Sequence, residues 1–596
     1  MNCKLGVSQH FLMTKILIAF IILLICSGCA ERVAEKGVFY TAGNWDIPPA
    51  YHGNPWAPGG VGVAGPFVHE PLFVYIPTCK EYISRLGESF IEGPLTLTVK
   101  LKKGVTWHDG EKFTSRDVKT TFYIGYLKNW EVWRNLQDIE CPDDSTVIFK
   151  WNRISPVNNI RVLTETITSP HHIFGEWADL IPDLREKEKN IDKNDEKLLL
   201  EYHKEAQKVR EVLYKYHPSL PIGTGPFEIG KVTASDIILD RYEHYYEVSN
   251  VHIEKIRIMR WGSNEVVWSY LMAGEMDAVA PACPYDVAQE ILKRNPGTTL
   301  ITPYDMSEFG LIYNCKKYPT KDLNFRKAIA HIINRDMVRQ VAYSYGETVD
   351  DYSFGIPKSF RKEWLSENFY KDLTRYDYNQ GKAEKILLDA GYKKDVRRNV
   401  WLTTDGKDIN LEIVSPAGLN DLILLAEASS SQLTKFGIPS QIRVIPLDLY
   451  GTIVQEGNFD LAAENGSQLS KYGHPSMSLN RFYYKESIIG KASGLTSKIN
   501  YKGREIDTEK LAEELNEVMD SKRRDEIVST LSYVTNEYLP FLTCYEKRII
   551  IFTLDGKRVT GWPKENDKIW GAAPGGVESL YCTMIVKGML KPAGEQ

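Results

Sequence analysis

Short runs in which every second residue is apolar recur along the chain and predict β-strands. The clearest cover residues 95–101 and 145–151, and the apolar runs at 237–239 and 256–259 are also strand-like. This alternation is typical of strands that bury one face. A further short strand is expected at residues 38–40.

Other stretches carry apolar residues at helical spacing and predict helices. They cover residues 114–126, 325–341, 383–390, 422–436 and 508–539. Helical and strand patterns alternate through the chain without a fixed-period repeat. This mixture favours an α/β or α+β architecture.

Two segments differ from the rest of the chain in amino-acid composition. Residues 44–65 are rich in Gly, Pro, Asn and Trp, which predicts a structured loop. Residues 184–216 are dense in both charge signs, with apolar residues at helical spacing, and predict one or two solvent-facing amphipathic helices. A coiled coil for a partner is the alternative for this second segment, but its heptads are not sustained.

The first residues predict export. An apolar run at 16–25 follows Lys15 and precedes Cys26-Ser27-Gly28-Cys29, the pattern of a secretory signal. The run is too short to span a bilayer core of ~30 Å. The ending Ser-Gly-Cys resembles a bacterial lipobox, with Cys26 where Leu is usual.

We therefore expect a lipoprotein signal peptide at 1–29, with Cys29 as the lipidated first residue of the mature chain, and a tether at 30–37. An ordinary cleaved signal, with Cys29 incidental, is the alternative. Translation could begin at Met1 or at Met13.

Composition narrows the class of protein further. No second apolar segment of 18 or more residues follows the signal, and the remaining chain is too long for one core. The net charge of -5 provides no basic surface for nucleic acid. Six cysteines remain without a Cys-x-x-Cys pair, and their disulfide pairing is open: Cys79, Cys141, Cys283, Cys315, Cys544 and Cys582.

Several motifs, in order, resemble those of the family 5 extracellular solute-binding proteins of ABC importers. They lie at residues 103–118, 223–227, 274–277, 324–330, 383–392 and 459–461. The first reads Lys-Gly-Val-Thr-Trp-His-Asp-Gly-Glu-Lys-Phe-Thr-Ser-Arg-Asp-Val, and the second Gly-Thr-Gly-Pro-Phe.

The resemblance implies a periplasmic-binding-protein-like fold of class II (cluster C), with two α/β lobes joined by a hinge and a smaller extra domain. Lobe I would be built from 38–75, 217–303 and 546–596. The extra domain would be 76–216, including the charged helical insertion 184–216, and lobe II would be 304–545.

Candidate catalytic and metal-binding groups have structural explanations. The cluster Trp107-His108-Asp109-Gly110 is expected to form a strand-to-helix turn. His171-His172 lacks a third ligand at metal-binding spacing. Gly-x-Ser-x-Gly, Walker and His-Glu-x-x-His motifs are absent from the sequence. We expect no cofactor, no metal and no catalysis.

The resemblance also bears on the ligand. Peptide-binding family members hold the ligand amine with an aspartate in a segment ending Asp-Pro. Here the matching segment ends His474-Pro475, with Lys471 or its neighbours at the expected acid, although Glu464 could substitute. A buried ammonium needs such a countercharge.

Aromatic and amide side chains in loops suit a sugar instead, and the segment 54–60 looks like that of cello- or manno-oligosaccharide binders. The candidate ligand-binding residues are Asn44, Trp45, Trp56, Trp261, Asn465, Gln468, Tyr472 and Trp570. The leading hypothesis is a monomeric, lipid-anchored, extracytoplasmic protein that delivers a β-linked oligosaccharide to ABC importer membrane subunits. A peptide-binding protein of the same family is second, and an exported hydrolase is third.

Overall fold

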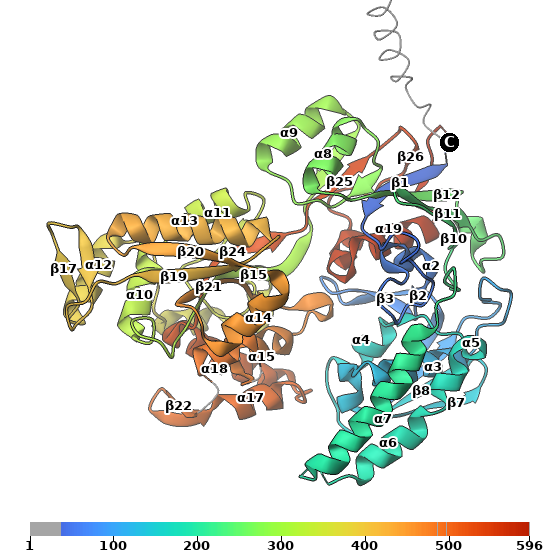
Figure 1. Ribbon diagram of the computed structural model, residues 1–596, viewed down its shortest axis with the longest axis horizontal. Helices are drawn as coiled ribbons and strands as arrows, with labels where there is room; N and C mark the ends of the chain where they lie inside the picture. The colour runs from blue at the N-terminus through green and yellow to red at the C-terminus, as the bar shows by residue number, and fades with distance from the viewer. Residues whose placement is uncertain (1–36, 193, 486, 496–497, 595–596) are drawn as a thin grey trace, which may run out of the picture.

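Two large lobes and a third domain make up the molecule (Figure 1). The computed structural model describes residues 37–594 apart from 193, 486, 496 and 497. The predicted signal peptide with Cys29, and the tether up to residue 36, lie outside the described residues. Mixed helix and sheet in two lobes with a further domain confirm the predicted fold class.

Lobe I contains two small sheets. The first has the order β1-β12-β11-β10, and the second has the order β13-β25-β14. β1 pairs with β12 in parallel, although more than 200 residues separate them. The strands are β1 (Val38–Gly43), β10 (Phe227–Val232), β11 (Asp236–Arg241), β12 (Lys255–Arg260), β13 (Ala278–Val279), β14 (Thr298–Ile301) and β25 (Ile551–Leu554).

Helices complete lobe I. The helix α19 (Val577–Val586) and the single turn α2 (Gly65–Val68) pack in one hydrophobic core with strands β1, β10, β11 and β12. α8 (Asn264–Met272) and α9 (Tyr285–Arg294) instead share a core with lobe II.

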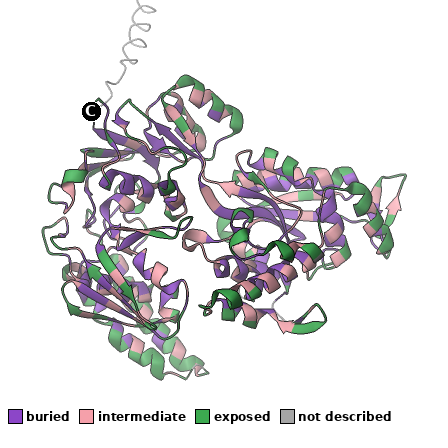
Figure 2. Cartoon of the chain, turned by 180° about the vertical axis from the view of Figure 1, so that it is seen from behind, coloured by how far each residue is buried: buried purple, intermediate pink, exposed green. Residues whose placement is uncertain are grey.

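The extra domain is an antiparallel sheet covered by helices. Its sheet order is β5-β6-β8-β7. The strands are β5 (Gly87–Glu92), β6 (Thr96–Leu101), β7 (Leu136–Asp143) and β8 (Thr146–Trp151), and the helices are α3 (Ser115–Leu127), α4 (Asn158–Leu163), α5 (His171–Ala178), α6 (Ile181–Asn190) and α7 (Glu196–Lys215). The charged insertion forms α6 and α7, which lie at the edge of the domain with a largely exposed outer face (Figures 1 and 2).

Lobe II is built on a six-stranded sheet of order β16-β24-β15-β21-β19-β20. The strands are β15 (Tyr304–Tyr313), β16 (Glu347–Thr348), β19 (Leu411–Pro416), β20 (Ser440–Ile445), β21 (Leu461–Gln468) and β24 (Phe541–Arg548). The helices are α10 (Leu323–Ile332), α11 (Arg335–Ala342), α12 (Gln380–Asp389), α13 (Asn420–Phe436), α14 (Leu447–Glu456), α15 (Pro475–Tyr483), α16 (Ile488–Ser493), α17 (Thr508–Leu515) and α18 (Ser521–Tyr538).

Two short segments connect lobes I and II. The chain passes from β14 to β15 between Ile301 and Tyr304, and from β24 to β25 between Arg548 and Ile551. β24 therefore extends past the boundary expected at 545/546. Short paired crossings of this kind are the places where a hinge can absorb backbone rotation.

Two stretches expected as single helices are each divided. Residues 325–341 form α10 and α11, because the Asn334 side chain accepts a hydrogen bond from the Met337 backbone and caps a new helix. Residues 508–539 form α17 and α18, with Asp520 capping the second through the Arg523 backbone. Asn and Asp are preferred N-cap residues, so each marks a boundary.

The cluster Trp107-His108-Asp109-Gly110 lies in the predicted turn before α3. Trp107 is fully buried, and Gly110 takes a φ of +87° in the turn that follows it. His172 pairs with Asp109 at 2.7 Å. Among the described residues, no group of three or more His, Cys, Asp or Glu side chains could hold a metal ion.

Two further findings concern the described part of the chain. Cys79, Cys141, Cys283, Cys315, Cys544 and Cys582 are free thiols there. Between residues 37 and 594, with the gaps given above, no helix is long and apolar enough to cross a membrane.

Candidate ligand-binding pocket

A cavity of about 810 Å³ lies where lobe I, the extra domain and lobe II meet. Lobe I contributes the loop 44–66, residues 73–75, Arg260 and the start of α19. The extra domain contributes Thr164, Thr166 and Thr168, and lobe II contributes Lys471. The volume falls within the ~300–1,000 Å³ typical of small-molecule sites.

Trp45 forms part of the cavity wall and is held rigidly. Its indole N–H donates to the carbonyl of Thr233 at 3.0 Å. Arg260 donates to the Trp45 carbonyl at 3.1 Å, and its guanidinium carbon lies 5.3 Å from the indole centroid. Trp45 is only 6% exposed, so it presents a small apolar surface to the cavity.

Glycines leave room along the wall. Gly59 and Gly62 take φ values of +89° and +53°, which a residue with a side chain rarely adopts. Gly575, at the end of the 3₁₀ segment η7 (Lys568–Gly575), also lines the cavity, and a Cβ placed on it would meet no heavy atom within 4 Å. The space beside Gly575 is therefore open.

Uncharged polar groups also line the cavity. Thr164, Thr166 and Thr168 alternate along the short strand β9 (Thr166–Ile167) and its flanks, and all three line the cavity. His69 also lines it, and burial lowers the pKa of His69 to about 3, so the ring is neutral near pH 7. Such groups can exchange hydrogen bonds with hydroxyls without introducing charge.

The charged lining is sparse. Asp46 and Arg260 come from lobe I, and Lys471 comes from lobe II. Glu464, the acid that could substitute for an amine-binding aspartate, lies on β21 with its carboxyl 3.8 Å from Arg481. Burial raises the pKa of Glu464, and the Arg481 guanidinium opposes that shift. Glu464 therefore already has Arg481 as its ion-pair partner. It is also not among the residues that line the cavity.

Two of the predicted site residues, Asn44 and Trp45, line the cavity, and the others are not among its lining residues. Trp56 lies in a core with α5 and α7, where its indole donates to Ser169 at 2.8 Å. Trp570 lies in the lobe I core and donates to the carbonyl of Lys564. Trp261 is half-buried against the core that joins α8 and α9 to lobe II.

The predicted lobe II residues flank Lys471. Asn465 and Gln468 are half-buried on β21, and the Asn465 side-chain oxygen is buried without a hydrogen-bond partner. The guanidinium carbon of Arg161 lies over the ring of Tyr472, 5.2 Å from the centroid of that ring. None of these three is among the lining residues of the cavity, whereas their neighbour Lys471 is.

Sequence reasoning did not select Arg260, the alternating threonines or Gly575. The spacing Thr164-x-Thr166-x-Thr168 was a usable signal, because period-two spacing places side chains on one face. Arg260 and Gly575 carried no local signal, since only the tertiary fold brings them beside Trp45.

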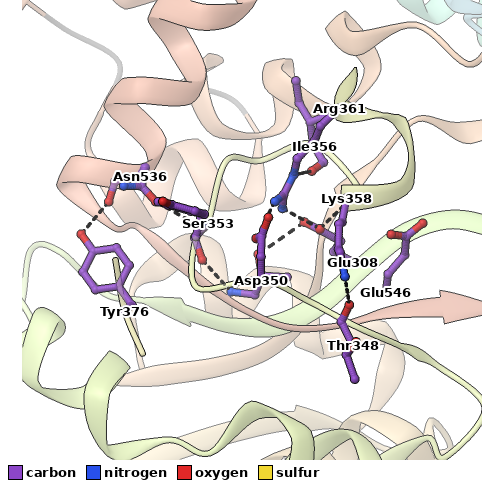
Figure 3. A network of polar contacts seen from close by, with 12 residues as sticks. Glu308, Thr348, Asp350, Ser353, Ile356, Lys358, Arg361, Tyr376, Asn536 and Glu546 are labelled. Atoms are coloured by element: carbon purple, nitrogen blue, oxygen red, sulfur yellow. Dashed lines mark hydrogen bonds and ion pairs between the residues drawn. The ribbon is translucent and has the colours of Figure 1, made fainter. Parts of the chain in front are cut away.

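A buried acidic network lies in lobe II (Figure 3). Glu308 and Glu546 lie opposite each other on β15 and β24, and both are fully buried. Arg361 donates to Glu308 at 2.8 Å and to Asp350 at 2.7 Å. The backbone N–H of Ser359 donates to Glu546 at 3.0 Å.

These bonds anchor the 3₁₀ segment η4 (Lys358–Glu363) to the sheet. At its end, Glu363 pairs with Lys80 of the extra domain at 2.7 Å. The network therefore supports one of the contacts between lobe II and the extra domain.

Two α/β lobes, short crossings between them and a cavity at the junction define a binding protein of the periplasmic type. The chain belongs to the bacterial extracellular solute-binding proteins, family 5, whose model matches residues 82–489. It is 26% identical over 390 residues to the oligopeptide-binding protein AppA of Bacillus subtilis, covering 63% of this chain and 64% of AppA. The chain thus aligns with less than two thirds of that relative.

Solved structures show the same fold over nearly the whole chain. A periplasmic oligopeptide-binding protein of an oligopeptide ABC transporter from Thermotoga maritima has a TM-score of 0.70 at 22% identity, covering 94% of this chain and all of that one. Its mannohexaose-bound structure has a TM-score of 0.68 at 22% identity, covering 95% of this chain and all of that one. Bacillus subtilis AppA with a nonapeptide has a TM-score of 0.62 at 19% identity, covering 94% and 100%.

Proposed function

We propose that this protein is the extracytoplasmic solute-binding component of an ABC importer and that it captures an oligosaccharide in the cavity at the junction of its three domains. The observation that carries the proposal is the cavity itself, which draws its walls from lobe I, the extra domain and lobe II. A ligand that touches all three would favour the closed arrangement, because it binds that arrangement more tightly than an open one. The importer would then recognise the closed form.

The lining supports a sugar. Three threonines and Asn44 offer hydrogen bonds to hydroxyls, and Trp45 and Tyr75 offer aromatic surface. Each hydrogen bond would contribute about 0.5–1.5 kcal/mol. Lys471 would repel a peptide ammonium placed beside it. The Thermotoga neighbour crystallised with mannohexaose has the same fold.

A peptide is the second candidate. AppA of Bacillus subtilis was crystallised with a nonapeptide, and Asp46 of this chain lines the cavity as a carboxylate that could receive an ammonium. An oligosaccharide is preferred because Asp46 is an exposed loop residue, and exposed ion pairs contribute ~0–1 kcal/mol.

Attachment to the membrane through acylated Cys29 is part of the same proposal. It rests on the Ser27-Gly28-Cys29 ending of the apolar segment. A lipid anchor would keep the binding protein near the importer.

Isothermal titration calorimetry with mannohexaose, cellopentaose and a nonapeptide tests the ligand class. The Gly575→Phe variant tests the location, since Gly575 lines the cavity and a Cβ there would meet no heavy atom within 4 Å. We expect Gly575→Phe to fold normally and to lose at least tenfold in affinity. Gly381→Phe, near the start of α12 in lobe II, is the matched control and should bind like wild type. Tight binding of the nonapeptide alone, or full affinity in Gly575→Phe, would contradict the proposal.

A further inference from the structure

Arg161 of the extra domain makes a compact contact with lobe II beside the cavity. Its guanidinium carbon lies 5.2 Å from the ring centroid of Tyr472. One terminal nitrogen lies 3.9 Å from the sulfur of Met477, and the other donates to Glu131 at 2.6 Å. Tyr472 and Met477 belong to lobe II, whereas Glu131 belongs to the extra domain. Arg161 thus joins the two.

This contact is more enclosed than the ion pairs nearby. The Arg161 side chain is 14% exposed, and its Nε is buried without a hydrogen-bond partner. In the pair Arg153–Glu517, which also joins the extra domain to lobe II, the side chains are 66% and 51% exposed. A cation on an aromatic face is stabilised more when both are removed from water. We therefore expect the contact between the extra domain and lobe II to depend on Arg161 and not on Arg153.

The segment that Arg161 contacts also carries the lobe II wall of the cavity. The 3₁₀ turn η6 (Ser470–Tyr472) contains Lys471, and Leu469 before it donates to the carbonyl of Met306 at 3.0 Å. Gly473 after it takes a φ of +66°, and a Cβ there would lie 3.1 Å from the Pro77 side chain. The turn is thus fixed to lobe II at one end and lies against the extra domain at the other.

A carboxyl group on the extra-domain side faces the same turn. Glu165 follows α4 between two threonines that line the cavity. Burial raises the pKa of Glu165, and the positive charge of Lys471 opposes that shift most strongly. Lys471 therefore lies within electrostatic range of Glu165, and its place at the cavity depends on how the turn is held.

We propose that Arg161 is a positioning residue: stacked on Tyr472, it holds the turn 470–473 against the extra domain and so keeps Lys471 at the cavity wall. The effect of Arg161 on ligand binding rests on the proposed function. Its effect on the docking of the turn does not, because every contact that supports the docking is between protein groups.

Hydrogen–deuterium exchange on the ligand-free protein tests the docking. In Arg161→Leu we expect exchange at residues 469–475 to become at least tenfold faster, while peptides from the sheet of lobe II are unchanged. Arg153→Leu, at the same interface, is the matched control and should leave residues 469–475 as in wild type. Unchanged exchange at 469–475 in Arg161→Leu would overturn the proposal.

Substitutions at the ring separate stacking from a general effect on folding. Tyr472→Phe keeps the aromatic face and should behave like wild type, whereas Tyr472→Leu should match Arg161→Leu. Arg161→Lys keeps the charge without the planar group and should fall between them. The double variant Arg161→Leu/Tyr472→Leu should have a smaller effect than the sum of the two single variants, because each single variant already removes the contact between Arg161 and Tyr472. Additive effects would show that the two side chains act independently and would refute the stacking role.

Stopped-flow dissociation of mannohexaose tests the consequence for the ligand. Arg161→Leu should release the sugar at least tenfold faster than wild type and Arg153→Leu, with a similar association rate. If wild type binds no sugar, the proposed function fails, and the exchange experiment still decides the role of Arg161. If wild type binds and Arg161→Leu releases the sugar at the wild-type rate, the ligand-site role of Arg161 is wrong.

Discussion

Glu546 should make the protein less stable as the pH rises toward neutrality. Its carboxyl is fully buried, and one oxygen has no hydrogen-bond partner. Arg361 forms its ion pairs with Glu308 and Asp350, and its positive charge offsets only part of the shift at Glu546. Burial raises the pKa of Glu546 from 4.5 to about 7, and the facing Glu308 adds to the rise.

The sign follows from proton binding. At pH values between the unfolded pKa of 4.5 and the folded pKa of about 7, the Glu546 carboxyl holds a proton in the folded state that it has released in the unfolded state. The free energy of unfolding therefore falls as the pH rises. The contribution is fully present below the unfolded pKa and is lost as the pH passes through the folded pKa. At about 1.4 kcal/mol for each pKa unit, the loss over the whole titration amounts to about 3.5 kcal/mol.

Glu546→Gln removes this titration and keeps an acceptor for the Ser359 N–H. Urea unfolding followed by tryptophan fluorescence, at a series of pH values from about 5 to 8, should show wild type losing about 2.5 kcal/mol relative to the variant. The difference between the two proteins cancels the titrating groups that do not interact with Glu546. Glu88→Gln, at an exposed glutamate of β5, should follow wild type. A wild-type-minus-variant difference that is flat with pH would refute the reasoning.

Three further predictions concern anchoring, the tryptophans and turnover. Cys29→Ala should release the protein from membranes or block its processing; unchanged membrane fractionation and mass would remove the lipid anchor from the account. Trp45→Ala should weaken sugar binding and abolish the ligand-induced fluorescence change, because Trp45 lines the cavity, whereas Trp56→Ala should lower the thermal midpoint and keep that change. Prolonged incubation with a sugar that binds should yield no cleavage products by chromatography; release proportional to protein concentration would restore the hydrolase hypothesis.

Local patterns predicted most of the elements because each depends on residues close in sequence. The strand at 95–101 and the helix at 114–126 correspond to β6 and α3, whose apolar spacing and capping Thr114 are visible in the sequence. The family motifs then implied two lobes, a relation between distant segments that periodicity cannot supply.

The site was harder to predict because its walls come from distant segments. Asn54-Pro55-Trp56 reads as a loop that could face a ligand. In the fold, the Asn54 amide donates to the carbonyls of Leu213 and Tyr216, which ties the loop to the end of α7 and places Trp56 in a core. A contact spanning about 160 residues leaves no local trace in the sequence.

The most direct test of the central claim is a crystal structure of the protein with mannohexaose. The account predicts sugar density in the cavity at the junction of the three domains, in contact with Trp45, the threonines 164–168 and Lys471. Sugar bound elsewhere, or a peptide occupying the cavity through an ammonium on Asp46, would contradict it.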